Sequence, residues 1–121
     1  MPEDIGPGHK FDDGKPKVDL VDPEFIYDVA IAAEYGAKKY APWNWLGGFA
    51  YMRCFASIMR HLLEWARGRD VDEESGLPHL SMAAAQLMFL MHQVRRPEQY
   101  GHLDDRPKFE DVEIKKEDDR W

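Results

Sequence analysis

The sequence predicts a small all-α domain, and three observations support this fold class. Apolar residues recur at helical spacing in three separate stretches. These stretches are bounded by residues that typically start or stop helices, namely Asp, Gly and Pro. Most apolar residues lie between Phe25 and Val94, whereas both ends of the 121-residue chain are polar. A single helical core over residues 23–96 is therefore expected, with a polar segment on each side.

The first helix is expected over residues 23–39. Asp22 followed by Pro23 is a typical helix start, because Asp accepts hydrogen bonds from free N–H groups and Pro is tolerated in the first turn. The apolar positions of this stretch are Phe25, Val29, Ala33 and Ala37. Residues 1–22 contain three Pro and three Gly, so we expect an extended arm there rather than a regular element.

Two further helices follow along the chain. The second is expected over residues 50–67 and ends at Gly68, and its apolar positions are Tyr51, Phe55, Ile58, Leu62 and Trp65. The third is expected over residues 78–95 and is closed by Pro97, and its apolar positions are Leu80, Ala83, Leu87, Met91 and Val94. Three short helices cannot cover this much apolar surface, so we expect burial against a second copy of the chain.

The remaining residues, 97–121, are rich in charge and are predicted to form a polar, solvated tail. Within this segment, residues 109–114 alternate between apolar and acidic side chains, and such a pattern is also compatible with a strand. The solvated tail is the preferred interpretation.

Composition excludes several classes of protein. The formal net charge of −7 argues against binding of nucleic acid through broad phosphate neutralisation, but not against a nucleotide held through a metal ion. Cys54 is the single cysteine, so neither an intramolecular disulfide nor a thiolate zinc cluster is expected. No apolar run approaches the about 20 residues that cross a bilayer, and no signal peptide is evident. A cytoplasmic protein without membrane contact is expected.

A cluster of metal-ligating residue types lies where the second helix joins the third. His61 and Glu64 are three residues apart on one helix and share a face, and His79 begins the next helix. The connector between them is acidic and includes Asp72 and Glu74. If the two helices form an antiparallel hairpin, these five side chains converge on a site that suits Mg²⁺ or Mn²⁺. The alternative is a solvated acidic turn in which Ser75 caps the third helix.

A second group of residues surrounds the end of the first helix. Lys38 and Lys39 close that helix, and an aromatic loop follows with Trp43, Asn44 and Trp45. The lysines suit phosphate groups and the loop suits a base. Equally, cations stabilise a helix C-terminus, and tryptophans fill a core or an interface between copies. The core interpretation is preferred for Trp45.

Taken in order, several segments resemble the phage dATP/dGTP diphosphohydrolase family, a MazG-like branch of the all-α NTP pyrophosphatases. The resemblance covers residues 8–95. Its segments are residues 10–16, residues 18–20, residues 36–40, Asn44-Trp45, Arg60-His61-Leu62, Trp65, Gly68, Asp72, residues 74–80 and Ala83. Two positions depart from the family pattern, because Arg69 and Met82 stand where an acidic residue and a histidine are frequent.

The resemblance implies a MazG-like helical bundle completed by oligomerisation into a dimer or tetramer. It implies Mg²⁺- or Mn²⁺-dependent hydrolysis of dGTP or dATP to the monophosphate and pyrophosphate in phage nucleotide metabolism. Some members of the family resemble enzymes of a 2-aminoadenine genome pathway. The implied metal ligands are His61, Glu64, Asp72, Glu74 and His79, of which Glu64 and Glu74 are the catalytic candidates. The implied substrate-binding residues are Phe11, Lys15, Lys38, Lys39, Trp43, Asn44 and Arg60.

Two other functions remain compatible with the same residues. One is a non-catalytic helical interaction module, in which the tryptophans anchor a partner and the acidic connector is solvated. The other is a metal phosphohydrolase that cuts the triphosphate at a different position.

Overall fold

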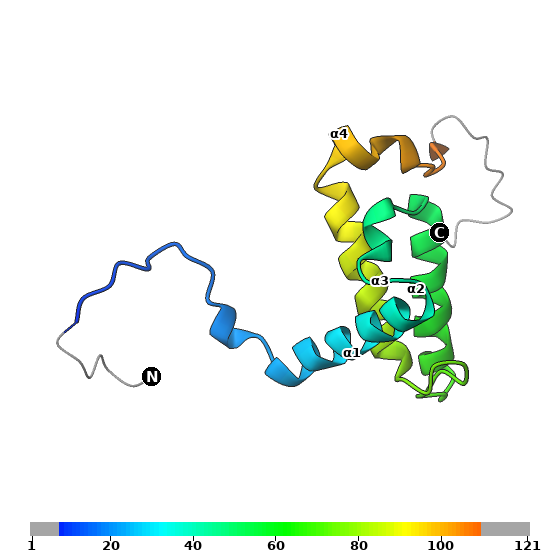
Figure 1. Ribbon diagram of the computed structural model, residues 1–121, viewed down its shortest axis with the longest axis horizontal. Coiled ribbons are helices and arrows are strands. Elements are labelled where there is room, and N and C mark those ends of the chain that lie inside the picture. The colour runs from blue at the N-terminus through cyan, green and yellow to red at the C-terminus, as the bar shows by residue number, and fades with distance from the viewer. Residues whose placement is uncertain (1–7, 110–121) are drawn as a thin grey trace, which may run out of the picture.

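The computed structural model describes residues 8–109, and this part of the chain is helical throughout its regular structure (Figure 1). Its α-helices are α1 (Pro23–Lys39), α2 (Tyr51–Ala66), α3 (His79–Val94) and α4 (Pro97–Tyr100). Short 3-10 turns span Val18–Leu20, Asn44–Gly47 and Gly101–Leu103. Between residues 8 and 109 there is no strand, only an isolated bridge that joins Val71 to Pro78. The predicted all-α class is confirmed for these residues.

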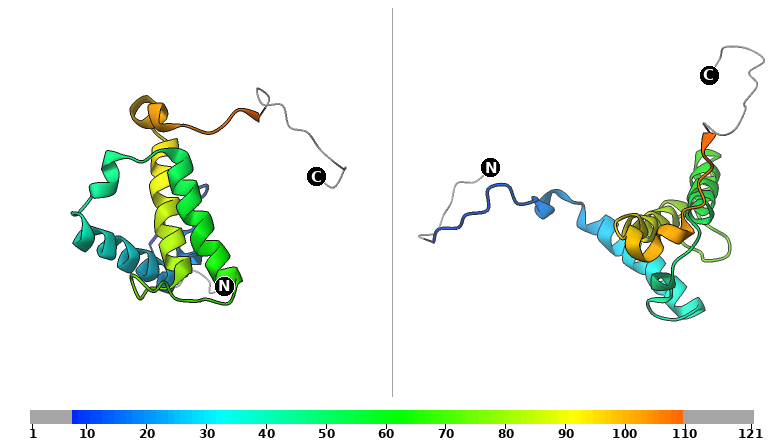
Figure 2. Two further views of the ribbon diagram at one scale, coloured as in Figure 1. Left: turned by 90° about the vertical axis from the view of Figure 1, so that its right-hand side faces the viewer. Right: turned by 90° about the horizontal axis from the view of Figure 1, so that it is seen from above.

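Helices α2 and α3 form the centre of the molecule. They lie side by side as an antiparallel hairpin, and α1 crosses α3 near the closed end of that hairpin (Figures 1 and 2). One cluster of buried apolar residues consists of Ala32 from α1 with Ala85 and Phe89 from α3. Trp45, Phe49, Leu77 and Met82 pack against it while remaining partly exposed. The small alanine side chains let α1 approach α3 closely at this crossing.

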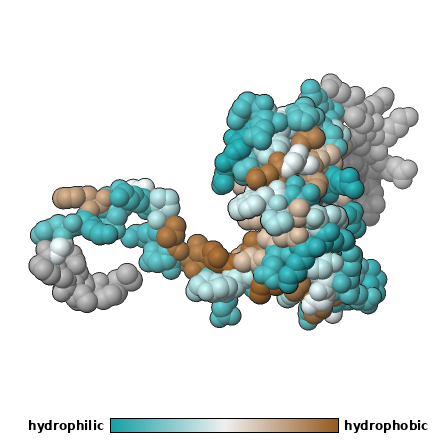
Figure 3. Space-filling model, in the orientation of Figure 1, coloured by the Kyte–Doolittle hydropathy of each residue, from teal (hydrophilic) through white to brown (hydrophobic). Residues whose placement is uncertain are grey.

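The start of α1 is formed as predicted from its capping residues. The Asp22 carboxylate accepts a hydrogen bond from the Glu24 backbone N–H at 3.0 Å, and Pro23 occupies the first helical position. Before it, residues 8–22 are all exposed and run away from the bundle as an extended arm with one 3-10 turn (Figure 1). Apolar side chains gather where this arm joins α1 (Figure 3), including Leu20 and Ile26.

The C-terminal segment departs from the expected polar tail. Pro97 ends α3 but also starts α4, because proline is well suited to the first position of a new helix. Tyr100 is consequently buried, and its hydroxyl donates a 2.6 Å hydrogen bond to the carbonyl of Leu46. The packed part of the chain therefore extends past residue 96, where the helical core was expected to end. The strand alternative at 109–114 lies almost entirely outside the described residues.

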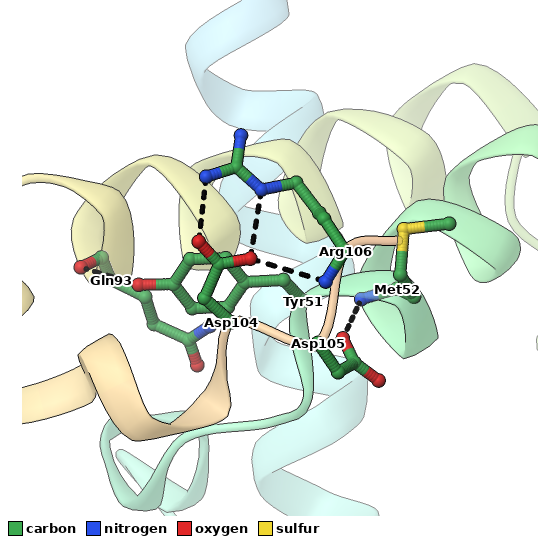
Figure 4. A network of polar contacts seen from close by, with 6 residues as sticks. All are labelled: Tyr51, Met52, Gln93, Asp104, Asp105 and Arg106. Atoms are coloured by element: carbon green, nitrogen blue, oxygen red, sulfur yellow. Dashed lines mark hydrogen bonds and ion pairs between the residues drawn. The ribbon is translucent and has the colours of Figure 1, made fainter. Parts of the chain in front are cut away.

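Residues 104–106 continue across the start of α2 (Figure 4). Ala50, the residue before α2, offers no side-chain cap, and the Asp105 carboxylate instead accepts a 2.9 Å hydrogen bond from the Met52 N–H. Arg106 pairs with Asp104 at 2.6 Å and lies over the Tyr51 ring. A carboxylate from far along the chain thus satisfies one of the free N–H groups at this helix end.

Helices α2 and α3 leave apolar side chains exposed. On α3 these are Leu80, Leu87, Met88, Met91 and Val94, and on α2 they include Phe55 and Leu62. Apart from Met88, the spacing on α3 alternates between three and four residues once Ala84 is included, which is the pattern of a helix seam that packs against another helix. None of the helices within residues 8–109 combines the length and apolar character needed to cross a membrane.

Replacing Gly48 with Ala should destabilise the fold. Gly48 has φ +90°, and an added Cβ would lie 2.7 Å from Leu103 Cδ1 and 3.0 Å from Tyr100 Cδ1. We expect Gly48→Ala to lower the free energy of unfolding by about 1–3 kcal/mol, measured by denaturant titration. Gly47→Ala is the matched control, because a Cβ at Gly47 meets nothing within 4 Å. Equal effects of the two substitutions would contradict this account of the loop.

Candidate functional site

A cavity of about 780 Å³ lies between α1, the loop of residues 41–49, α2 and α3. This volume falls in the range of pockets that hold small molecules. Its wall combines apolar residues of the helices, such as Ala32, Cys54 and Phe89, with polar groups at one side. The predicted site residues that line it are Lys39, Trp43, Asn44, Arg60, His61, Asp72 and Glu74. Most of the substrate and metal residues named from the sequence are thus brought to one cavity.

Three potential metal ligands converge beside this cavity. His61 comes from α2, His79 is the first residue of α3, and Asp72 belongs to the connector between them. The two Nδ1 atoms are 2.9 Å apart, and one oxygen of Asp72 lies within 4.8 Å of the ligand atoms of both histidines. Burial lowers the pKa of His61, so its imidazole is neutral at physiological pH and can offer a lone pair. Two imidazoles and a carboxylate are a donor set that fits a divalent metal ion.

The connector is an ordered turn, held by hydrogen bonds around Asp72. Its carboxylate accepts the Ser75 N–H at 2.8 Å, its carbonyl accepts the Gly76 N–H at 2.7 Å, and its own N–H donates to the Leu77 carbonyl at 2.8 Å. Gly76 has φ +73°, a conformation that glycine adopts without strain. Although burial opposes it, hydrogen bonding to Ser75 lowers the pKa of Asp72, so this carboxylate is ionised.

Ser75 therefore does not cap α3, the role that the sequence suggested as an alternative. Its hydroxyl accepts the Leu77 N–H at 3.1 Å inside the connector, and the residue before α3 is Pro78, which offers no side-chain cap. The backbone N–H of His79 donates to the Asp70 carbonyl at 2.9 Å, which fixes the start of α3 to the connector. Ser75 thus stabilises the turn that carries Asp72 and does not cap α3.

Glu74 lines the cavity but lies outside the group of three ligands. It forms an ion pair with Lys39 at the end of α1 and accepts a 3.4 Å hydrogen bond from the Tyr35 hydroxyl. Lys39 lowers the pKa of Glu74, and Glu74 in turn raises the pKa of Lys39, so both groups are charged. This pair joins the connector to α1 across the mouth of the site.

Glu64 is also held by cations. Arg69 donates to one of its oxygens at 2.8 Å and Arg67 to the other at 3.4 Å. The hydrogen bond from Arg69 lowers the pKa of Glu64. Glu64 is absent from the cavity wall and from the His61, Asp72 and His79 group. Arg69, which stands where the family resemblance led us to expect an acidic residue, is thus a hydrogen-bond partner of Glu64.

The other predicted substrate residues lie further away. Lys38 pairs with Glu34 on the exposed side of α1 at 3.0 Å. Phe11 and Lys15 lie in the extended arm, Phe11 with 91% of its surface exposed, and neither lines the cavity of its own chain. Their assignment to substrate binding remains a prediction.

Both tryptophans of the aromatic loop line the cavity, and Trp45 is the more buried of the two. Trp45 stacks on Phe89 with ring centroids 5.0 Å apart and meets the edge of His92 at 5.0 Å, as the core interpretation predicted. Trp43 has φ +63°, remains 68% exposed, and lines the cavity together with Asn44. Positive φ is uncommon for a non-glycine residue, and the residues that adopt it are concentrated at functional sites.

Two residues that position this loop were missed from the sequence. Gln93 is 1% exposed, and its amide accepts the Phe49 N–H at 2.7 Å and donates to the Phe49 carbonyl at 3.0 Å. The Tyr100 hydroxyl donates a hydrogen bond to the carbonyl of Leu46 in this loop. The available signal for Gln93 was an amide on a mainly apolar helix, a signal that Gln86 shares. Nothing local indicates that Tyr100 folds back.

Within the described residues these features define a small all-α domain with a candidate metal centre beside a nucleotide-sized cavity. The chain belongs to the family described as "dATP/dGTP diphosphohydrolase, N-terminal", whose model matches residues 6–106. The resemblance seen in the sequence is thereby confirmed.

A curated relative carries the name dATP/dGTP diphosphohydrolase and comes from Salmonella phage PMBT28. It is 41% identical over 83 residues, a stretch that covers 69% of this chain and 28% of the relative. The matching part thus spans less than a third of the relative's length. No solved structure is significantly similar to this chain.

Removing the Gln93 amide should loosen the loop that carries the tryptophans. Gln93→Leu leaves the half-buried N–H and carbonyl of Phe49 without this partner, and we expect the free energy of unfolding to fall by about 1–3 kcal/mol. Gln86→Leu on the same helix is the control, and it should cost less. Chemical denaturation followed by tryptophan fluorescence measures both. A Gln93→Leu protein as stable as the parent would refute the positioning role.

Proposed function

We propose that this domain binds a purine deoxynucleoside triphosphate in the cavity and, with Mg²⁺ or Mn²⁺, hydrolyses it to the monophosphate and pyrophosphate. The observation that carries the proposal is the convergence of His61, Asp72 and His79 beside a cavity with cationic and aromatic groups. Membership of the family and the name of the phage relative support the same reaction. An interaction module has no need of such a convergence of ligands.

The metal ion would be held by His61, Asp72 and His79. When bound, such an ion neutralises triphosphate charge and makes a water molecule a better nucleophile. Lys39 and Arg60 lie on the cavity wall, where they can bind phosphate oxygens. Lys39 must then share its charge between the substrate and Glu74, with which it pairs in the free protein.

A carboxylate is needed to accept the proton of the attacking water. Of the two catalytic candidates, Glu74 is the better placed, because it lines the cavity and is ionised through its contact with Lys39. Glu64 is engaged by two arginines away from the cavity. We therefore assign Glu74 as the general base and Glu64 to stabilisation of the turn after α2.

Recognition of the base is assigned to the aromatic loop. The exposed Trp43 ring offers a face for stacking, and the Asn44 side chain carries both a donor and an acceptor for a base edge. In a phage, such an activity would remove dGTP or dATP from the nucleotide pool and supply the monophosphate. That monophosphate is the starting point for making 2-aminoadenine nucleotides when the starting triphosphate is dGTP.

The proposed reaction predicts that pyrophosphate is a product and that activity depends on a divalent metal ion. With Mg²⁺ or Mn²⁺ and dGTP or dATP, the full chain should release pyrophosphate, measured by ion-exchange chromatography, and excess EDTA should stop it. Asp72→Asn should lower kcat by about 100-fold or more, because it removes one of three metal ligands. Asp70→Asn is the control, since Asp70 contributes only its backbone carbonyl to the connector. Orthophosphate as the product, or full turnover in EDTA, would contradict the proposal.

We also propose that a second copy of the chain covers the exposed apolar face of the α2–α3 hairpin. Leu80, Leu87 and Met91 follow a seam spacing on α3, and Phe55 and Leu62 lie seven residues apart on α2. Each such side chain contributes about 1.5–3 kcal/mol when it is buried, so leaving this face in water is costly. Two hairpins that pack through these seams form a four-helix bundle, and a further pairing would give a tetramer.

Assembly is tested by the mass of the protein in solution. Light scattering should give at least twice the chain mass of 14.1 kDa. Leu87→Glu should shift the protein towards monomer, because it places a charge in the seam. Val71→Glu is matched to it in exposure, 51% against 52%, but lies in the connector and should leave the mass unchanged. A folded, active monomer of the parent chain would overturn the proposal.

A further inference from the structure

The donor set of the candidate metal centre is unusual for a magnesium site. Two of its three members are imidazoles, and the single carboxylate comes from Asp72. Mg²⁺ prefers oxygen ligands in a strict octahedron and keeps several of its waters. Imidazole nitrogen is instead a good ligand for first-row transition ions, which also accept a carboxylate beside two histidines. The ligand types therefore favour a first-row transition ion over Mg²⁺, the ion that binds most triphosphates in solution.

The nearby carboxylates do not restore an oxygen-rich site. Glu74 is engaged by Lys39 and Tyr35, and Glu64 by Arg69 and Arg67. Each of these acids already has a cation as its partner, whereas Asp72 has only the hydrogen bonds from Ser75. Five predicted ligands are thus reduced to three, and nitrogen is the majority donor.

The distance between the ring nitrogens of the two histidines is compatible with binding of a transition ion. An ion that binds two nitrogens at about 2.0–2.1 Å and near a right angle holds them about 3 Å apart. The Nδ1 atoms of His61 and His79 are 2.9 Å apart. The same separation also suits a hydrogen bond between the two rings, so the two arrangements need an experiment to separate them.

The pair is also held in place by the fold. His79 is 6% exposed and begins α3, where its N–H is bonded to the Asp70 carbonyl. His61 projects from the middle of a long helix in the same hairpin. Both rings are therefore set by the packing of α2 on α3, and little rearrangement is needed to bind an ion between them.

We propose that His61 and His79, with Asp72, select a first-row transition ion such as Mn²⁺ or Co²⁺ over Mg²⁺ at this centre. The inference rests on the proposed function for the role of the ion in hydrolysis, and it concerns only which ion these residues hold. Open coordination positions would remain for water and phosphate oxygens, because the protein supplies three ligands.

Cobalt provides a test that does not depend on activity. Co²⁺ added to the metal-free full chain should give visible absorption bands that saturate at one ion per chain and persist in a large excess of Mg²⁺. His79→Gln should weaken Co²⁺ binding by about tenfold or more, and His61→Gln should do the same if the first variant does not fold, as judged by circular dichroism. His102→Gln removes an exposed histidine outside the group and should leave the bands unchanged.

Two results would overturn the inference. Displacement of Co²⁺ by a comparable concentration of Mg²⁺ would show that the imidazoles do not select the ion. Bands that are unchanged in both folded histidine variants would show that the two rings form a hydrogen bond and do not bind the metal. Failure of the proposed reaction looks different, because the parent chain would then bind Co²⁺ through both histidines yet release no pyrophosphate.

Discussion

The turn that joins α2 to α3 is the constraint on which the rest of the site depends. Its backbone is closed on both sides of Asp72, by the Leu77 carbonyl and by the Gly76 N–H, and the Asp72 carboxylate is fixed by Ser75. Because these hydrogen bonds hold the turn around Asp72 and the His79 N–H bonds to the Asp70 carbonyl, the last part of α2 and the first residue of α3 lie side by side. The meeting of the two histidines is a direct consequence.

The position of α1 depends on weaker and more distributed contacts. Its packing on α3 rests on small residues such as Ala32 and Ala85, and the Lys39–Glu74 pair at its end is exposed on both sides. An exposed ion pair contributes little to stability, typically 0.2–1 kcal/mol. The pair nevertheless places a lysine and a carboxylate at the mouth of the cavity. Its role is therefore to position charge, while the α1–α3 crossing supplies the stability.

Local signals explain which parts of this structure were predictable. Asp22 and Pro23 mark the start of α1 through chemistry that acts within one turn, and the hairpin follows from two helices joined by a short connector. The grouping of His61, Asp72 and His79 follows from that hairpin. The partners of Glu64 and Glu74 depend instead on which cation reaches them in three dimensions. The burial of Tyr100 likewise depends on a contact 54 residues away along the chain.

The single cysteine gives the cavity a chemical reporter. Cys54 is 2% exposed, lies in the cavity wall, and has its pKa raised by burial, so its thiol is protonated and shielded from reagents. Alkylation of the native protein then requires a local rearrangement that exposes the sulfur to the reagent. The rate of thiol modification therefore measures how often this rearrangement exposes the sulfur. A molecule that fills the cavity lowers this rate without contacting the sulfur.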